Sequence, residues 1–202
     1  MACFLKNVLG SGNNACKENP AGVSNFVMIV PLDADHISEI GVHDGANQYV
    51  ITPAGSNATA LKGYRIDFKS QTGQVTSEDN GGGKAWTHTG TGRVEQNEDD
   101  MAFTSRALSN MDGKFLAFFP TGNVTKEGQE WKVVGNPFGD TEFTVAADSG
   151  AARGDDHGQT FTVTCAYQLY PVMKWYGAIQ KEEDPTSSDL ADDTSDNITI
   201  TD

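Results

Sequence analysis

The 202-residue sequence lacks the usual signatures of disulfide-rich, zinc-binding and membrane-spanning proteins. Its three cysteines, Cys3, Cys16 and Cys165, are odd in number and far apart, so they predict neither a disulfide framework nor a paired-thiol zinc site. The four histidines are scattered and do not have the i to i+4 spacing of a helical zinc site. No apolar run reaches transmembrane length, and residues 1–6 lack the pattern of a secretory signal. We therefore expect synthesis in the cytosol.

Basic residues are also scarce. The chain has 14 Lys and Arg against 28 Asp and Glu, which gives a net charge of −14. The segment from Glu182 onward holds eight of the acids and no Lys or Arg, so the preceding part is acidic too, at about −6. An acidic surface repels phosphate and argues against tight nucleic-acid binding. It is compatible with DNA that passes by without being held.

Two groups of residues suggest a ligand site at first sight. The run Gly81-Gly-Gly-Lys84 has neither the earlier glycine, the following Ser or Thr, nor the helix of a phosphate-binding loop, so it predicts a hairpin tip. A cluster of acids and one imidazole could surround a cation, but the calcium-loop pattern is absent and a solvated turn is favoured. The cluster comprises Asp140, Asp148, Asp155, Asp156 and His157.

Catalytic motifs are missing as well. No serine lies in a Gly-x-Ser-x-Gly sequence, and no Ser, His and Asp set stands out. The pair Asp99-Asp100 could serve acid–base chemistry, but its position favours the first turn of a helix. We expect no enzymatic activity, no cofactor and no bound metal.

Alternating apolar and polar residues predict a mainly β chain with one helix. From Tyr64 to Lys69 the alternation is regular, and in a later strand Trp86, His88, Gly90, Gly92 and Val94 share one face. Strands are predicted over residues 23–30, 47–52, 59–69, 72–77, 84–96, 115–120, 131–135, 141–145 and 160–167, the last three as a meander. Loops are predicted over 33–45 and 79–83, and a capped helix over Asn97–Met111.

The chain divides into an N-terminal arm (1–22), a β-domain (23–170) and a C-terminal arm with an acidic tail (171–202). The first arm contains turn-forming sequences such as Asn19-Pro-Ala-Gly22. The apolar run 171–179 has two interpretations, because periodicity does not separate them. It is either the last strand of the domain or an arm that docks on a neighbouring protomer.

Over residues 1–170 the sequence resembles phage tail tube proteins. The likeness rests on the Met-Ala-Cys start, on Asn19-Pro-Ala-Gly-Val23, on the order of hairpins and helix, and on Lys132-Val-Val-Gly135. It continues through Ser149-Gly150 and 156–158 into Thr160-Phe-Thr-Val-Thr164. In local sequence and spacing, the chain most resembles structural proteins of gut Bacteroidetes phages, including the crAss-like group. The region 41–55 and the extension past Gln180 depart from this pattern.

This resemblance implies a tail-tube-like β-sandwich or barrel with a long hairpin loop and extended arms. It implies a virion structural protein that forms a hexameric or larger ring in a tail or neck, assembled in the bacterial cytoplasm. Its partners would be other copies and tail, portal or capsid proteins, with DNA as non-specific cargo during ejection. The lumen would carry acidic or small polar side chains. The alternatives are a capsid decoration or fibre-anchoring protein and, third, a carbohydrate-active or other enzyme.

Subunit contacts are expected at the hairpin tip, at the loop 148–158 and on the apolar run. The candidate residues are Asp79, Asn80, Gly81, Gly82, Gly83, Asp148, Ser149, Gly150, Asp155, Asp156, Trp175 and Tyr176.

Overall fold

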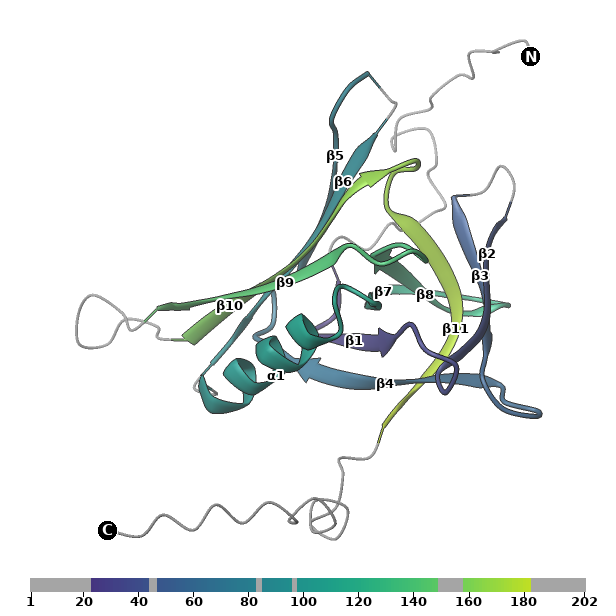
Figure 1. The fold of residues 1–202 in the computed structure, drawn as a ribbon, viewed down its shortest axis with the longest axis horizontal. Coiled ribbons are helices and arrows are strands. Elements are labelled where there is room, and N and C mark those ends of the chain that lie inside the picture. Colours follow the sequence, from purple (N-terminus) through teal and green to yellow (C-terminus); the bar gives the residue numbers. More distant parts are fainter. Residues whose placement is uncertain (1–22, 44–46, 83–84, 96–97, 149–157, 183–202) are drawn as a thin grey trace, which may run out of the picture.

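Over the residues that the structure describes, the protein folds into a closed β-barrel, a second β-sheet and one helix (Figure 1). The computed structural model describes residues 23–43, 47–82, 85–95, 98–148 and 158–182, so the expected N-terminal arm and the part of the C-terminal arm after residue 182 lie outside it. The elements are β1 (Phe26–Pro31), β2 (Ile37–His43), β3 (Gln48–Pro53), β4 (Ala60–Asp67), β5 (Gln74–Asp79), β6 (Trp86–Val94), α1 (Glu98–Asn110), β7 (Phe115–Thr125), β8 (Gly128–Val134), β9 (Thr141–Asp148), β10 (Gly158–Gln168) and β11 (Met173–Lys181). The expected mainly β fold with one helix is confirmed.

Five strands form the barrel, in the order β11-β4-β1-β7-β8, and β11 closes it by pairing with β8. The pairs β1–β4 and β1–β7 are antiparallel, whereas β11 runs parallel to β4. The hairpin β2–β3 extends the sheet through a contact between Gln48 and Lys174. Closure leaves no exposed edge among the five barrel strands.

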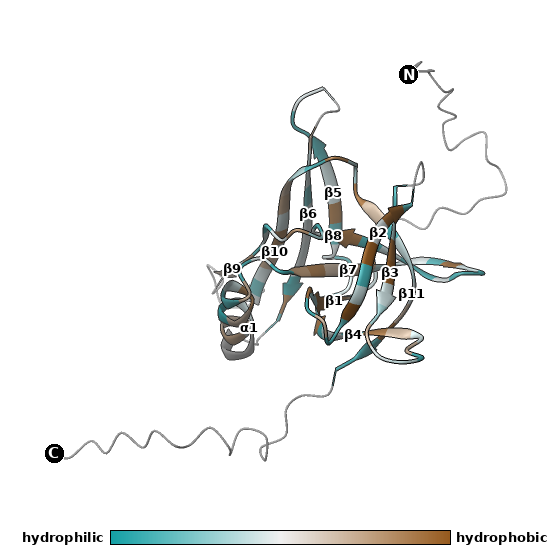
Figure 2. Cartoon of the chain, turned by 45° about the vertical axis from the view of Figure 1, so that its right-hand side comes forward, coloured by the Kyte–Doolittle hydropathy of each residue, from teal (hydrophilic) through white to brown (hydrophobic). Residues whose placement is uncertain are grey.

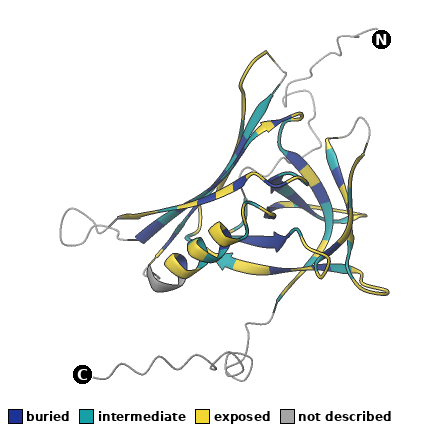
Figure 3. Cartoon of the chain, in the orientation of Figure 1, coloured by how far each residue is buried: buried dark blue, intermediate teal, exposed yellow. Residues whose placement is uncertain are grey.

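A four-stranded antiparallel sheet, in the order β5-β6-β10-β9, packs against one side of the barrel. The barrel strands β1 and β7 are therefore covered on both faces, which Figure 3 shows as dark blue on β1. In β1, Met28 and Val30 belong to the core inside the barrel, whereas Val27 and Ile29 belong to the core between barrel and sheet. This double burial explains why β1 and β7 are almost uniformly apolar. Figure 2 shows hydrophobic residues on β7 and β8 in the middle of the molecule.

Glycines on β6 allow the sheet to approach the barrel closely. A Cβ on Gly90 would lie 2.5 Å from the ring of Phe119, and one on Gly92 would lie 2.7 Å from the ring of Phe161. Both aromatic rings therefore pack directly on the β6 backbone. His88 and Val94 are buried on the same face, so the predicted shared face of β6 is confirmed.

Helix α1 covers one end of the core between barrel and sheet. Met101 and Leu108 are buried in that core, and Met111 packs at its border. After the helix, Asp112 and Gly113 both have positive φ, and a Cβ on Gly113 would lie 2.9 Å from the backbone nitrogen of Thr141. The glycine thus ends the helix where β9 begins.

Three sequence predictions differ from the structure. The expected loop 33–45 was wrong, because residues 37–43 form β2, whose polar sequence hides its pairing with β3. The expected meander over 131–167 was also wrong, since β8 belongs to the barrel and β9 and β10 to the other sheet. Residues 173–181 form a strand within the barrel, so the run 171–179 is the last strand of the domain, and the expected domain boundary at 170 moves to Lys181.

Candidate assembly surface

The face of the four-stranded sheet that points away from the barrel is built mostly from threonines; we call it the threonine face. Side chains alternate along each strand, and the residues between those in the core all point to this face. It has fourteen described positions, of which eight are threonine. They are Gln74, Thr76, Glu78, Thr87, Thr89, Thr91, Arg93, Glu142, Thr144, Ala146, Thr160, Thr162, Thr164 and Ala166.

Strand register arranges these residues in rows across the sheet. One row runs Gln74, Thr91, Thr162, Thr144, and the hydroxyl of Thr144 donates to the Thr162 carbonyl at 3.5 Å. The next row runs Thr76, Thr89, Thr164, Glu142. Threonine fits this position because its β-branched side chain favours strands while its hydroxyl stays hydrated. The result is a polar surface of short side chains.

Charge on the threonine face is low and slightly acidic. Its charged residues are Glu78, Glu142 and Arg93, and lysine is absent from the described positions. Phosphate binding requires clusters of basic side chains, which these positions do not supply. A nucleic acid in contact with this face would therefore be repelled weakly and not held.

The two outer strands of this sheet, β5 and β9, each pair with one strand only within the described residues. Exposed edges in monomeric proteins are usually guarded by charged side chains, especially lysine, by proline, by a bulge or by a covering helix or loop. Neither β5 (Gln-Val-Thr-Ser-Glu-Asp) nor β9 (Thr-Glu-Phe-Thr-Val-Ala-Ala-Asp) contains lysine or proline, and both pair in unbroken register. The outer strand β2, in contrast, has a register shift between Ile37 and Glu39. The edge of β5 is thus suited to pairing with another chain, and so is the edge of β9 beyond Thr141, whose N–H donates to the Gly113 carbonyl at 3.2 Å.

The expected contact residues fall in different places. Asp79 ends β5, and Asn80, Gly81 and Gly82 form the exposed β5–β6 turn, where the Asp79 carboxylate accepts a hydrogen bond from the Gly81 N–H at 2.9 Å. Asp148 ends β9. Gly83, Ser149, Gly150, Asp155 and Asp156 lie outside the described residues. The β5–β6 turn thus follows one outer strand, β5, and Asp148 ends the other, β9.

The side chains of Trp175 and Tyr176 make contacts within the chain itself. Trp175 is buried inside the barrel against Phe118, with ring centroids 5.5 Å apart, so its side chain is not available to a neighbour. Tyr176 points to the other side of β11 and donates a hydrogen bond to Glu130 at 3.0 Å. The apolar run that suggested a docking arm is explained by barrel closure.

Glu130 is a buried carboxylate on the outside of β8. It accepts hydrogen bonds from the Tyr176 hydroxyl, the Lys174 ammonium at 3.3 Å and the Asn123 amide at 3.4 Å. Burial acts to raise the pKa of Glu130, but the Tyr176 hydrogen bond, the Lys174 charge and the Asn123 amide outweigh it and hold this pKa below its ordinary 4.5. Burial and the Glu130 hydrogen bond raise the pKa of Tyr176 to about 12. This network joins β7, β8 and β11 and stabilises the seam where the barrel closes.

Glu130 should make stability depend on pH. Because its pKa is lower in the folded state, its contribution is complete above the ordinary value of 4.5 and is lost as pH falls through the lowered pKa. We expect the free energy of unfolding, measured by urea titration from pH 7 to pH 3, to fall less steeply in Glu130→Gln than in the wild type. Equal slopes in the two proteins would contradict this role.

Ligand and membrane features are few in the described chain. No group of three His, Cys, Asp or Glu in these ranges could hold a metal ion, and Asp155, Asp156 and His157 lie outside them. The described helix is too short and too polar to cross a membrane. Comparisons with protein-family models, with curated proteins and with solved structures find no match.

The sequence contains a pattern of alternating threonines that indicates the threonine face, and the search for motifs did not use it. The alternations Thr87-x-Thr-x-Thr91 and Thr160-x-Thr-x-Thr164 place threonine on one face of two strands. Only the register shows that these strands are neighbours, with Thr91 opposite Thr162 and Thr89 opposite Thr164.

Proposed function

We propose that this protein is a virion structural protein that forms a ring or tube segment of a phage tail or neck through which DNA passes. The observation that carries the proposal is the four-stranded sheet whose two outer strands lack lysine, proline and bulges. Pairing of β5 in one copy with β9 in the next would continue the sheet from copy to copy. Such a heterologous contact closes into a ring when its rotation allows.

A continuous sheet of this kind would enclose an open passage. Six copies would supply a circumference of roughly 115 Å at about 4.8 Å between strands. Barrels with about 16–18 strands already leave an aqueous channel, and six sheets would exceed that number. Strand β10, with 11 residues, would give a wall roughly 35 Å high.

The threonine face is suited to line this passage. It is the face opposite the barrel, so a ring with the barrels outside turns these threonines inward. Short polar side chains with a slight acidic excess let DNA move without being held, because basic contacts to phosphate are missing. The expected lumen of acidic or small polar residues agrees with this composition.

Cysteine pairs across the two outer strands test the proposal. Thr144→Cys on β9 is combined in turn with Gln74→Cys, Thr76→Cys or Glu78→Cys on β5. All four side chains lie on the threonine face. If the register between the two copies shifts by two residues, the paired side chains still lie on this face. After oxidation, we expect at least one pair to give a ladder of covalent oligomers on a non-reducing gel, ending at the copy number of the ring.

Single-cysteine variants are the control, because they can form at most dimers. Cys3 and Cys16 are replaced by serine in every variant, whereas Cys165 is buried and is kept. Ladders in none of the three pairs would contradict ring closure through β5 and β9. Dimers or trimers with an exposed threonine face would instead support the decoration or fibre-anchoring alternative.

A further inference from the structure

We propose that the turn between β10 and β11 of one copy inserts into the mouth of the β-barrel of a second copy and so stacks one ring on the next. This inference rests on the proposed ring function and adds the contact that turns rings into a tube. The inserting turn is formed by Tyr167, Leu169 and Tyr170, and we call it the aromatic turn.

The aromatic turn exposes large apolar side chains. Tyr167 is 84% exposed and Leu169 is 75% exposed, and Tyr170 next to them is also exposed. Single exposed apolar residues are common, but three within four residues form a patch. Tyrosine is, with tryptophan and arginine, one of the residue types enriched among those that dominate binding energy at protein interfaces.

The turn is held rigidly in an unfavourable backbone conformation. Tyr167 has a φ of +58°, in the left-handed region that bulky residues seldom adopt, and the pairing of β10 with β6 shifts register here. The Gln168 amide donates to the Ala166 carbonyl at 2.8 Å and to the Cys165 sulfur at 3.0 Å, while His88 Nε2 lies 2.8 Å from the Tyr170 carbonyl oxygen. Backbone strain of this kind concentrates at functional sites. A turn fixed before binding loses little entropy when it binds.

The barrel mouth offers a hollow of matching size. A cavity of about 290 Å³ is lined by residues from all five barrel strands. That volume is at the lower limit of small-molecule pockets and suits one or two large side chains. The apolar lining includes Phe26, Met28, Trp131 and Ile179.

Charge also matches between the two surfaces. The charged residues that line the hollow are Arg65 and Lys181, both basic in a strongly acidic chain, although the Arg65 guanidinium also pairs with the Asp67 carboxylate at 2.6 Å. The Arg65 guanidinium lies 4.1 Å from the centroid of the Phe26 ring, so the mouth combines aromatic and cationic groups that favour a tyrosine partner. On the other side, Asp79 lies opposite Trp86, which lies opposite Gln168, so acids of the β5 end flank the aromatic turn.

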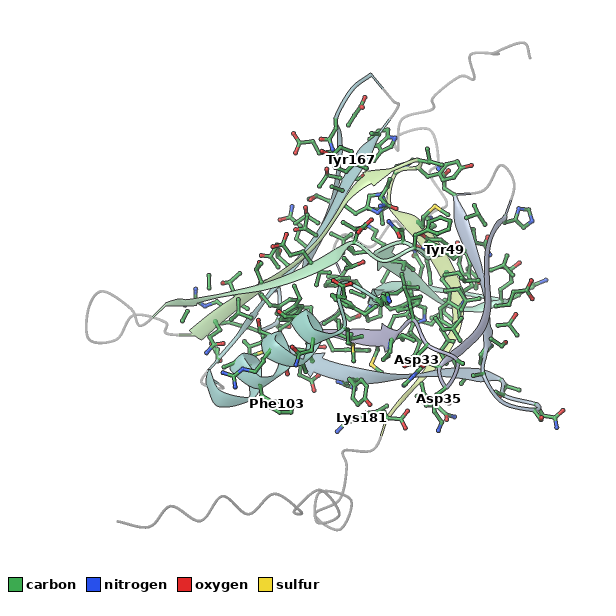
Figure 4. The ribbon with its side chains drawn as sticks, viewed as in Figure 1. Asp33, Asp35, Tyr49, Phe103, Tyr167 and Lys181 are labelled. Atoms are coloured by element: carbon green, nitrogen blue, oxygen red, sulfur yellow. The ribbon has the colours of Figure 1, made fainter. Side chains whose placement is uncertain are left out.

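The two surfaces lie at opposite ends of the molecule. Figure 4 shows Tyr167 at one end and Lys181, which lines the mouth, at the other. A contact between opposite ends of identical copies repeats without closing, and so builds a stack of open length. Because β10 would run along the lumen wall, the turn at its end would lie at the rim of the ring.

Substitution of Tyr167 separates stacking from folding. Asparagine tolerates positive φ better than tyrosine, so Tyr167→Asn should fold at least as stably as the wild type while it removes the main docking side chain. In electron micrographs of the full chain, we expect rings to persist and stacked rings to become about tenfold rarer. Phe138→Asn, which alters another fully exposed aromatic residue, should leave stacking unchanged.

A photoreactive phenylalanine at position 167 then locates the partner. We expect it to cross-link, between copies, to peptides that contain Phe26, Trp131 or Ile179. Cross-links to α1 or to the β2–β3 hairpin, or normal stacks in Tyr167→Asn, would overturn the inference and leave the ring proposal standing. A wild-type protein that forms neither rings nor stacks would instead overturn both.

Discussion

Replacing Phe161 by alanine is expected to lower the free energy of unfolding by about 3–5 kcal/mol, measured by urea titration at pH 7. Phe161 lies on β10 and is fully buried between the sheet and the barrel. Its ring stacks on Phe143 at a centroid distance of 5.7 Å and meets Phe68 edge-on at 5.6 Å. Alanine removes both contacts and leaves a cavity where the backbone of Gly92 has no side chain to fill it.

Phe138→Ala is the matched control, because this ring is 92% exposed in the connection between β8 and β9. We expect its free energy of unfolding to stay within about 0.5 kcal/mol of the wild type. A Phe161→Ala protein as stable as the Phe138→Ala protein would contradict the packing of sheet on barrel. That packing is what fixes the threonine face away from the barrel.

Lysines on the threonine face should turn a surface that does not hold DNA into one that does. The triple variant Thr89→Lys, Thr91→Lys and Thr162→Lys adds three positive charges per copy at positions that share this face. In a ring these charges would surround the passage and neutralise several phosphates together. With 6–10 phosphate contacts, we expect an affinity for duplex DNA that falls about 10³–10⁵-fold between 50 and 200 mM salt. Wild-type rings should show no such binding.

The control carries the same added charge on the β2–β3 hairpin, as Val42→Lys, Val50→Lys and Thr52→Lys, where all three side chains are exposed. These positions belong to the other sheet and not to the threonine face, so they should give at most weak binding. Equal DNA affinity in the two triple variants would show that the threonine face does not line the passage. Electrophoretic mobility shifts over a salt series measure both proteins.

Local patterns in the sequence predicted most individual elements, because alternation and helix caps depend on neighbours in the chain. The helix was predicted as 97–111 and found at 98–110, and β6 had the predicted buried face. The strand β2 was missed since it buries mainly Ile37 and so shows no alternation. Its structure depends on the pairing partner and not on its own composition.

The arrangement of the strands could not be predicted from local sequence patterns. Nothing in residues 131–145 shows that β8 leaves the sheet of β9 and β10 to close a barrel with β11. The same long-range pairing buries Trp175, whose apolar surroundings suggested a docking arm in the sequence. The aromatic turn and the barrel mouth likewise arise from residues distant in the chain. Only the folded chain brings each set together.

Electron cryo-microscopy of the assembled full chain tests the central claim most directly. The account predicts a closed ring in which β5 of each copy pairs with β9 of the next, with the barrels outside and Thr89, Thr91 and Thr162 facing an open passage. A ring whose passage is lined by the barrels would contradict it, and so would a protein that stays monomeric at the concentrations used for assembly.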